Sequence, residues 1–114
     1  MNELSPYQAL QQEDLFTAFV QQLRKDFEGA GEALDPSLII PSQLQDLQQV
    51  LAQQLTRVDK NGHLQGLLYR IDISEKQIKE ASEKQTLQKF EEVLSDLIIR
   101  RILQKIILRK KFSV

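Results

Sequence analysis

The sequence contains no cysteine and no tryptophan, and it has a single histidine, His63. Without cysteine the chain has no disulfide bonds, no thiolate chemistry and no cysteine metal sites, which fits a reducing compartment. Without tryptophan, a helix lying on a membrane surface lacks its usual interfacial anchor. One histidine also excludes the paired Glu-x-x-His motifs of a di-iron helical bundle.

Long apolar runs are also missing. The most apolar stretch, residues 97–108, is interrupted by Arg100, Arg101 and Lys105, whereas a transmembrane helix needs roughly 18 or more uncharged apolar residues. Residues 1–16 have neither a basic region nor an apolar core, so they do not resemble a signal peptide. We therefore predict a cytoplasmic protein with no membrane partner.

No motif of catalytic chemistry stands out. There is no glycine-rich phosphate loop, and His63 lies in a predicted loop, residues 59–63, where a solvated side chain is expected rather than a metal ligand or general base. The same loop matches the start of a calcium-binding EF-hand, but Leu64 and Arg70 stand where glycine and a bidentate glutamate are required. We predict that the protein is not an enzyme and binds no cofactor or metal.

The composition is that of a folded globular domain. Hydrophobic residues make up 41% of the 114 residues and charged residues 27%, so wholesale disorder is not expected. The length corresponds to one domain with its own core. We predict a single helical domain over residues 1–114, with a flexible N-terminal lead over about residues 1–9.

Apolar periodicity predicts an all-α fold, a small bundle of three main helices plus one or two short ones, with a long C-terminal helix. The first main helix, stopped by Gly29 and Gly31, has an apolar stripe at Leu15, Phe16, Phe19, Val20, Leu23 and Phe27. The second follows a capping box at Ser42 and Gln45 and carries Leu44, Leu47, Leu51, Leu55 and Val58. Shorter helical segments carry Leu38, Ile39 and Ile40, and then Leu64, Leu67, Leu68 and Ile71.

The tetrapeptide SEKQ occurs twice, at residues 74–77 and 82–85. Each copy can form a capping box, in which serine and glutamine satisfy each other's backbone amides. Because Ile78 and Leu87 would lie on opposite faces of a continuous helix, we predict a short helix near residues 74–81, a turn, and a long helix over about residues 82–110. The alternative is one helix with a solvated middle.

The predicted C-terminal helix changes its apolar face near residue 98. Its first part places Leu87, Phe90, Val93, Leu94 and Leu97 on one face, and its second part turns the opposite face apolar. A helix over residues 82–110 would be about 43 Å long and would project from a domain of about 30 Å. We therefore predict a self-association face at Ile98, Ile99, Ile102, Leu103, Ile106 and Ile107. The alternative is that different helices of the same chain cover the two ends.

Charge is unevenly distributed along the chain. Residues 1–57 carry eight acidic and three basic side chains, whereas residues 58–114 carry eight acidic and twelve basic ones. The last six basic residues form a candidate basic strip, Arg100, Arg101, Lys105, Arg109, Lys110 and Lys111.

Together these patterns favour a non-catalytic protein–protein interaction or assembly domain that forms a homodimer through its C-terminal helix. The identity of any other protein partner is open. The alternative function is a small nucleic-acid-associated regulatory protein that uses the basic strip. Nucleic acid is the less favoured partner, because no aromatic residues are interleaved with these basic side chains to stack on bases.

Overall fold

The computed structural model describes residues 6–35, 37 and 46–112, and these residues confirm the all-α fold class. They form the helices α1 Pro6–Ala9, α2 Glu13–Gly29, α3 Leu47–Lys60, α4 Leu64–Ile71, α5 Glu75–Lys84 and α6 Phe90–Phe112. Across this described part, no helix combines the length and the apolar character needed to cross a membrane.

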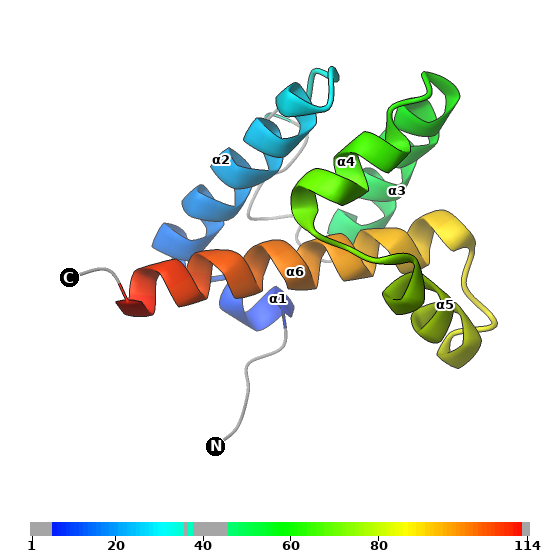
Figure 1. The fold of residues 1–114 in the computed structure, drawn as a ribbon. Helices are drawn as coiled ribbons and strands as arrows, with labels where there is room; N and C mark the ends of the chain where they lie inside the picture. The colour runs from blue at the N-terminus through cyan, green and yellow to red at the C-terminus, as the bar shows by residue number, and fades with distance from the viewer. Residues whose placement is uncertain (1–5, 36, 38–45, 113–114) are drawn as a thin grey trace.

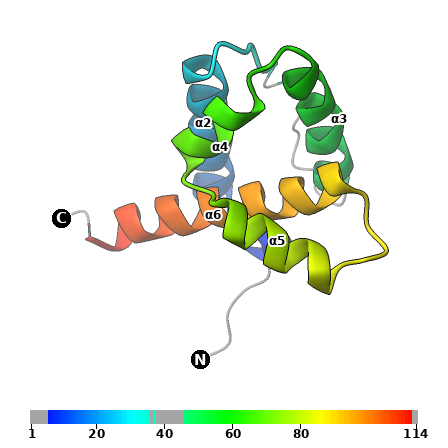
Figure 2. The ribbon, with the colours of Figure 1, turned by 45° about the vertical axis from the view of Figure 1, so that its right-hand side comes forward.

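Helix α6 is the central element of the fold. It contacts each of the other helices that the structure describes. Figures 1 and 2 show α2, α3 and α4 on one side of α6 and α1 and α5 on the other. With 23 residues, α6 is about 34 Å long, close to the longest dimension of the molecule, 38 Å. The helix therefore spans the molecule, and its last turns, exposed from Ile107 to Lys111, project beyond the other helices (Figure 2).

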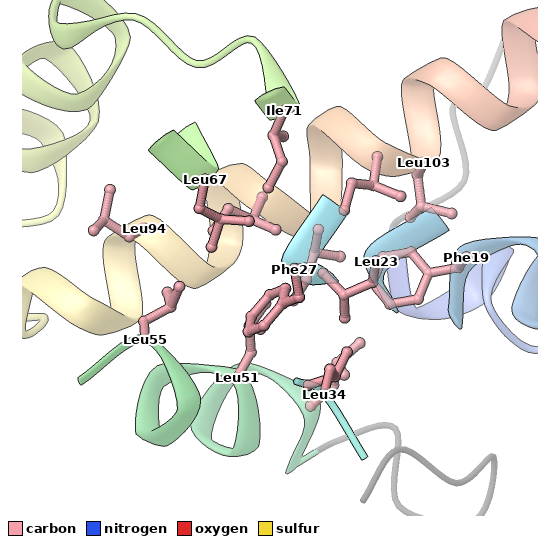
Figure 3. Close-up of a cluster of buried hydrophobic side chains, with 14 of the residues drawn as sticks. Phe19, Leu23, Phe27, Leu34, Leu51, Leu55, Leu67, Ile71, Leu94 and Leu103 are labelled. Atoms are coloured by element: carbon pink, nitrogen blue, oxygen red, sulfur yellow. The ribbon is translucent and has the colours of Figure 1, made fainter. Parts of the chain in front are cut away.

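The core forms where the apolar stripes of α2, α3 and α4 meet α6 (Figure 3). The predicted stripe of α2 is confirmed, since Leu15, Phe19, Leu23 and Phe27 are buried and Phe16 and Val20 are partly buried. The predicted stripes of α3 and α4 are confirmed where they are described, by the buried Leu47, Leu51, Leu55, Val58, Leu67 and Ile71. Leu38, Ile39, Ile40, Ser42, Leu44 and Gln45 lie outside the described residues.

The predicted self-association face of α6 is mostly part of this core. Five of its six members are at most 4% exposed, namely Ile98, Ile99, Ile102, Leu103 and Ile106. The sixth, Ile107, is 42% exposed. The structure therefore favours the alternative that the sequence left open, in which helices of the same chain cover this part of α6.

The predicted change of face along α6 is seen only in part, because Leu94 of the first face lies in the same core as the isoleucines, while Leu87 and Phe90 are exposed. The isoleucine face packs into the core with α2, α3 and α4. Helices α5 and α1 contact α6 from the other side (Figures 1 and 2), and Leu97 is partly buried. A helix that is apolar on both sides must be covered on both sides, and here different helices of the chain do so.

The ends of α2, α3 and α4 share one geometry. Gly31, Gly62 and Asp72 adopt left-handed backbone angles, with φ of 89°, 77° and 70°. The next residue in each case donates its amide to the carbonyl five positions earlier: Glu32 to Phe27, His63 to Val58, and Ile73 to Leu68. These are Schellman-type ends, which reverse the chain while satisfying helix-terminal carbonyls.

The two SEKQ copies have different roles. The first forms the predicted capping box, because the Ser74 hydroxyl accepts from the Gln77 amide and the Gln77 side chain accepts from the Ser74 amide. The second copy was wrongly predicted to start a helix. Ser82 lies inside α5, the turn falls at residues 85–89, and α6 begins at Phe90. At that start, the Glu92 carboxylate accepts a hydrogen bond from the Lys89 amide. This cap lies seven residues after Ser82, where the start of the long helix was predicted.

The N-terminal segment is also more structured than we predicted. Residues 6–9 form α1 instead of belonging to a flexible lead. Ala9 and Leu10 are buried, at 4% and 1% exposure. Because these two side chains are buried, the end of α1 packs against the core, where α1 contacts α6.

We expect Ile102→Ala to lower the free energy of unfolding by about 2–5 kcal/mol, because the side chain is fully buried and its removal leaves a cavity. Ile107→Ala is the matched control on the same helix, and its partly exposed side chain should cost less than half as much. Urea denaturation of both variants measures the difference. Equal losses would contradict the assignment of the two residues to different environments.

Candidate protein-interaction groove

A groove of about 670 Å³ lies along the C-terminal half of α6. Its floor runs from Leu97 to Leu108, and its walls come from Ala9, Leu15, Ile73 and Gln77. These wall residues belong to α1, α2, the α4–α5 connection and α5. The groove therefore depends on segments that are far apart in the sequence.

The floor of the groove includes a second stripe of α6 that has a leucine at each end and polar side chains between them. Leu97, Arg101, Gln104 and Leu108 follow a spacing of four, three and four residues, which places them on one face of a helix. Leu97 is half-buried, while Leu108 is 44% exposed. With Ile107, the groove thus holds apolar surface that the chain itself does not fully cover.

Helix α5 forms one wall of the groove, and it is only weakly anchored in the core. None of its side chains is buried, and Ile78 is only partly buried where it packs against the core. The capping box at Ser74 and Gln77 fixes the first turn of the helix, which brings Gln77 to the groove. The wall therefore presents a polar rim beside an apolar floor.

A second hollow, of about 440 Å³, lies between α3 and the beginning of α6. Its lining is largely polar, with Gln49, Gln53, Thr56, Lys89, Glu91 and Glu92. It offers little apolar surface for a partner to bury, so the α6 groove is the stronger candidate site.

The predicted basic strip does not form one continuous surface, because its members point to different neighbours. Arg100 pairs with Asp96 at 2.9 Å, and Arg101 pairs with Asp72 at 2.8 Å. Both arginines also line the groove. Their charges are thus partly compensated by acids of the same chain at the rim of the apolar floor.

Three other members of the strip turn toward α2 and α4. Lys105 Nζ donates to the Arg70 carbonyl at 3.2 Å, and Arg109 donates to Gln22 Oε1 at 3.1 Å. Lys110 pairs with Asp14, and Lys111 has an interaction of its own. Lys105 lies near the C-terminal end of α4, where a cation complements the helix dipole.

His63 is placed differently from the solvated loop position that we predicted. Its side chain is 42% exposed, and Nδ1 lies 2.5 Å from Glu32 Oε2. Asn61 Nδ2 donates to both Glu32 oxygens, at 3.2 and 3.1 Å, and Arg57 Nε lies 3.4 Å from Oε1. Glu32 is thus a nearly buried carboxylate that joins the ends of α2 and α3.

The contacts of Glu32 favour its charged form. The hydrogen bond from His63 is the main cause that lowers the pKa of this carboxyl, followed by the hydrogen bond from Asn61, while burial acts in the opposite direction. This arrangement serves to hold two helix ends together. No cluster of three histidine or carboxylate side chains suited to a metal ion occurs among the residues that the structure describes.

Sequence reasoning found part of the groove and missed the rest. It identified Arg100, Arg101, Leu103 and Ile107, but it gave them other roles, and it did not connect them to Ala9 or Ile73. The signal that was available was the incomplete apolar stripe from Leu97 to Leu108 on the side of α6 opposite the isoleucines. No protein-family model, curated protein or solved structure matches this chain.

We expect acid to weaken the fold partly through Glu32. Because its pKa is lower in the folded than in the unfolded chain, it stabilises the fold above its ordinary value of about 4.5, and that stabilisation is lost as pH falls through the lower, folded pKa. Glu32→Gln should therefore reduce stability at pH 7 and flatten the fall in unfolding free energy between neutral and acidic pH. Urea denaturation across this range measures both effects.

The matched control is Glu83→Gln, at an exposed position of α5. It should leave the pH profile of the wild type unchanged. A Glu32→Gln profile as steep as that of the wild type would contradict the role given to this carboxylate.

Proposed function

We propose that the chain is a non-catalytic protein–protein interaction domain that self-associates through the groove face of α6. The observation that carries the proposal is the apolar groove floor, with Ile107 and Leu108 at 42% and 44% exposure. Partly exposed apolar side chains gathered in a groove with a polar rim are typical of a protein-binding surface. An apolar groove between helices is also the usual receptor for an amphipathic helix.

The proposal keeps the C-terminal helix as the assembly element and changes the face that is used. The core takes up most of the isoleucine face, so Ile107 is the member of the predicted set that a second subunit can reach. Leu97 and Leu108 extend this surface along the groove. Self-association therefore uses the side of α6 that is bordered by α1, α5 and the start of α2.

The nucleic-acid alternative receives no support from the placement of the basic side chains. Phosphate binding needs several cations that reach one surface together. Here Arg101 pairs with Asp72, Lys110 pairs with Asp14, and Lys105 donates to a backbone carbonyl on α4. The basic strip is thus divided among neighbours within the chain.

We expect the wild type to sediment as a dimer at micromolar concentration and Ile107→Glu to sediment as a folded monomer. A carboxylate at this position puts a charge into the apolar groove without disturbing the buried face of α6. Analytical ultracentrifugation gives the oligomeric state, and circular dichroism gives the helix content.

Tyr69→Glu is the matched control, because Tyr69 is an exposed large side chain on α4, at 87% exposure, that does not line the groove. This variant should remain a dimer. A wild type that is monomeric at every concentration tested would contradict self-association, and a dimeric Ile107→Glu would exclude the groove as its site.

A further inference from the structure

The charged side chains that line the α6 groove are of one sign. Among the described residues of the lining, the charged ones are Arg100 and Arg101, and none is acidic. Because consecutive residues of a helix lie about 100° apart around its axis, the two arginines lie on either side of the line from Leu97 to Leu108. The apolar floor is thus flanked by positive charge.

The ion pairs that these arginines make within the chain still allow them to bind a further carboxylate. Arg100 pairs with Asp96. Arg101 pairs with Asp72, and neither aspartate lines the groove. The side chains of Arg100 and Asp72 are largely exposed, and ion pairs of exposed side chains contribute little free energy. Because a guanidinium group has five N–H donors, each arginine can bind a carboxylate of a partner beside the one already present.

The length of the groove suits a short helix. From Leu97 to Leu108 its floor extends about 16 Å at about 1.5 Å per residue, which is about three turns of a helix lying along it. An amphipathic helix binds such a groove by placing apolar side chains, spaced by three or four residues, on the floor. The partner residues on both sides of this stripe then face the two arginines, where a carboxylate forms charge-assisted hydrogen bonds.

A second copy of the chain complements the apolar floor but not the arginines. In a two-fold dimer, the same surface of each copy contributes to the interface. Self-association through the groove face therefore brings Arg100 and Arg101 of both copies into one interface, and like charges that meet there weaken the association. A helix that carries acidic side chains at the corresponding positions has the advantage over a second copy.

We infer that the groove also binds an acidic amphipathic helix of another protein, which displaces the second copy of this chain. The inference rests on the protein-interaction part of the proposed function and adds the chemistry of the partner. Arg100 and Arg101 bind its carboxylates, while Leu97, Ile107 and Leu108 contact its apolar side chains. Self-association is then the state of the chain in the absence of this partner.

Three fluorescently labelled peptides of about 18 residues, long enough to form a helix, test this inference by fluorescence anisotropy. The glutamate peptide has leucines at i, i+4 and i+7 and glutamates on both sides of them. The lysine peptide has lysines in place of these glutamates, and the serine peptide has serines in place of the leucines. We expect the wild type to bind the glutamate peptide at least about tenfold more tightly than either other peptide, because it alone matches both the floor and the arginines.

The charge-reversed variant Arg100→Glu/Arg101→Glu should invert this preference and bind the lysine peptide more tightly than the glutamate peptide. Lys25→Glu/Lys60→Glu is the matched control, because it changes the net charge equally at exposed positions that do not line the groove. This control should keep the preference of the wild type.

Circular dichroism first confirms that each variant has the helix content of the wild type. If the charge-reversed variant fails this check, Arg100→Gln replaces it, because this side chain is 60% exposed. Arg100→Gln should weaken the binding of the glutamate peptide but not that of the lysine peptide.

Sedimentation of the wild type with and without the glutamate peptide separates this inference from self-association. We expect the peptide to convert the dimer into a complex of one chain with one peptide. A dimer that does not bind the glutamate peptide would overturn the inference and leave self-association intact. A wild type that is monomeric alone but binds the glutamate peptide would support the inference and overturn self-association.

The peptide comparison tests the chemistry of the partner. Binding of the lysine peptide or the serine peptide as tight as that of the glutamate peptide would overturn the acidic amphipathic helix as the partner. A preference for the glutamate peptide that persists in the charge-reversed variant would overturn the role of the two groove arginines.

Discussion

The structure depends on the burial of one helix, α6, by all the others. Most amphipathic helices have one apolar face and need one set of neighbours. Helix α6 has a buried apolar face that includes Leu94, Ile98 and Ile102 and carries further apolar side chains, Leu97 and Leu108, outside that face, so the chain must cover more than one side. The core with α2, α3 and α4 covers the isoleucine face, and α5 and α1 lie across the other. The groove is the part of that second side where this cover is incomplete.

The polar contacts of the chain hold the remaining helices in position around α6. Glu32 joins the ends of α2 and α3 through His63, Asn61 and Arg57. Arg101 ties α6 to Asp72, the residue at which α4 ends. Such contacts contribute modestly where they are exposed. These contacts fix the positions of helix ends, which apolar packing alone does not determine.

The sequence was sufficient to predict those helices whose periodic apolar stripe packs against one surface, the core. The stripes of α2 and α3 were predictable because each helix packs one face against the core. Capping signals were less decisive, because a capping box stabilises a helix start only where the chain is not already helical. Ser82 carries the same tetrapeptide as Ser74, yet it lies within α5, and the following turn leaves Leu87 fully exposed.

The groove and the Glu32 cluster could not be predicted for a different reason. The groove needs Ala9 and Ile73 beside Leu108, and the cluster needs Glu32 beside His63. These neighbours are created by the way the helices pack, and no local pattern in the sequence records them. His63 looked like a solvated loop residue because its carboxylate partner is 31 positions away.

Residue-level hydrogen exchange tests most directly whether α6 is the element on which the fold depends. We expect the amides of residues 98–106 to exchange only through global unfolding and to be the slowest in the chain. Those of α5, which has no buried side chain, should exchange orders of magnitude faster through local opening. Protection in α5 equal to that in α6, or faster exchange in the middle of α6 than in α2 and α3, would contradict the account.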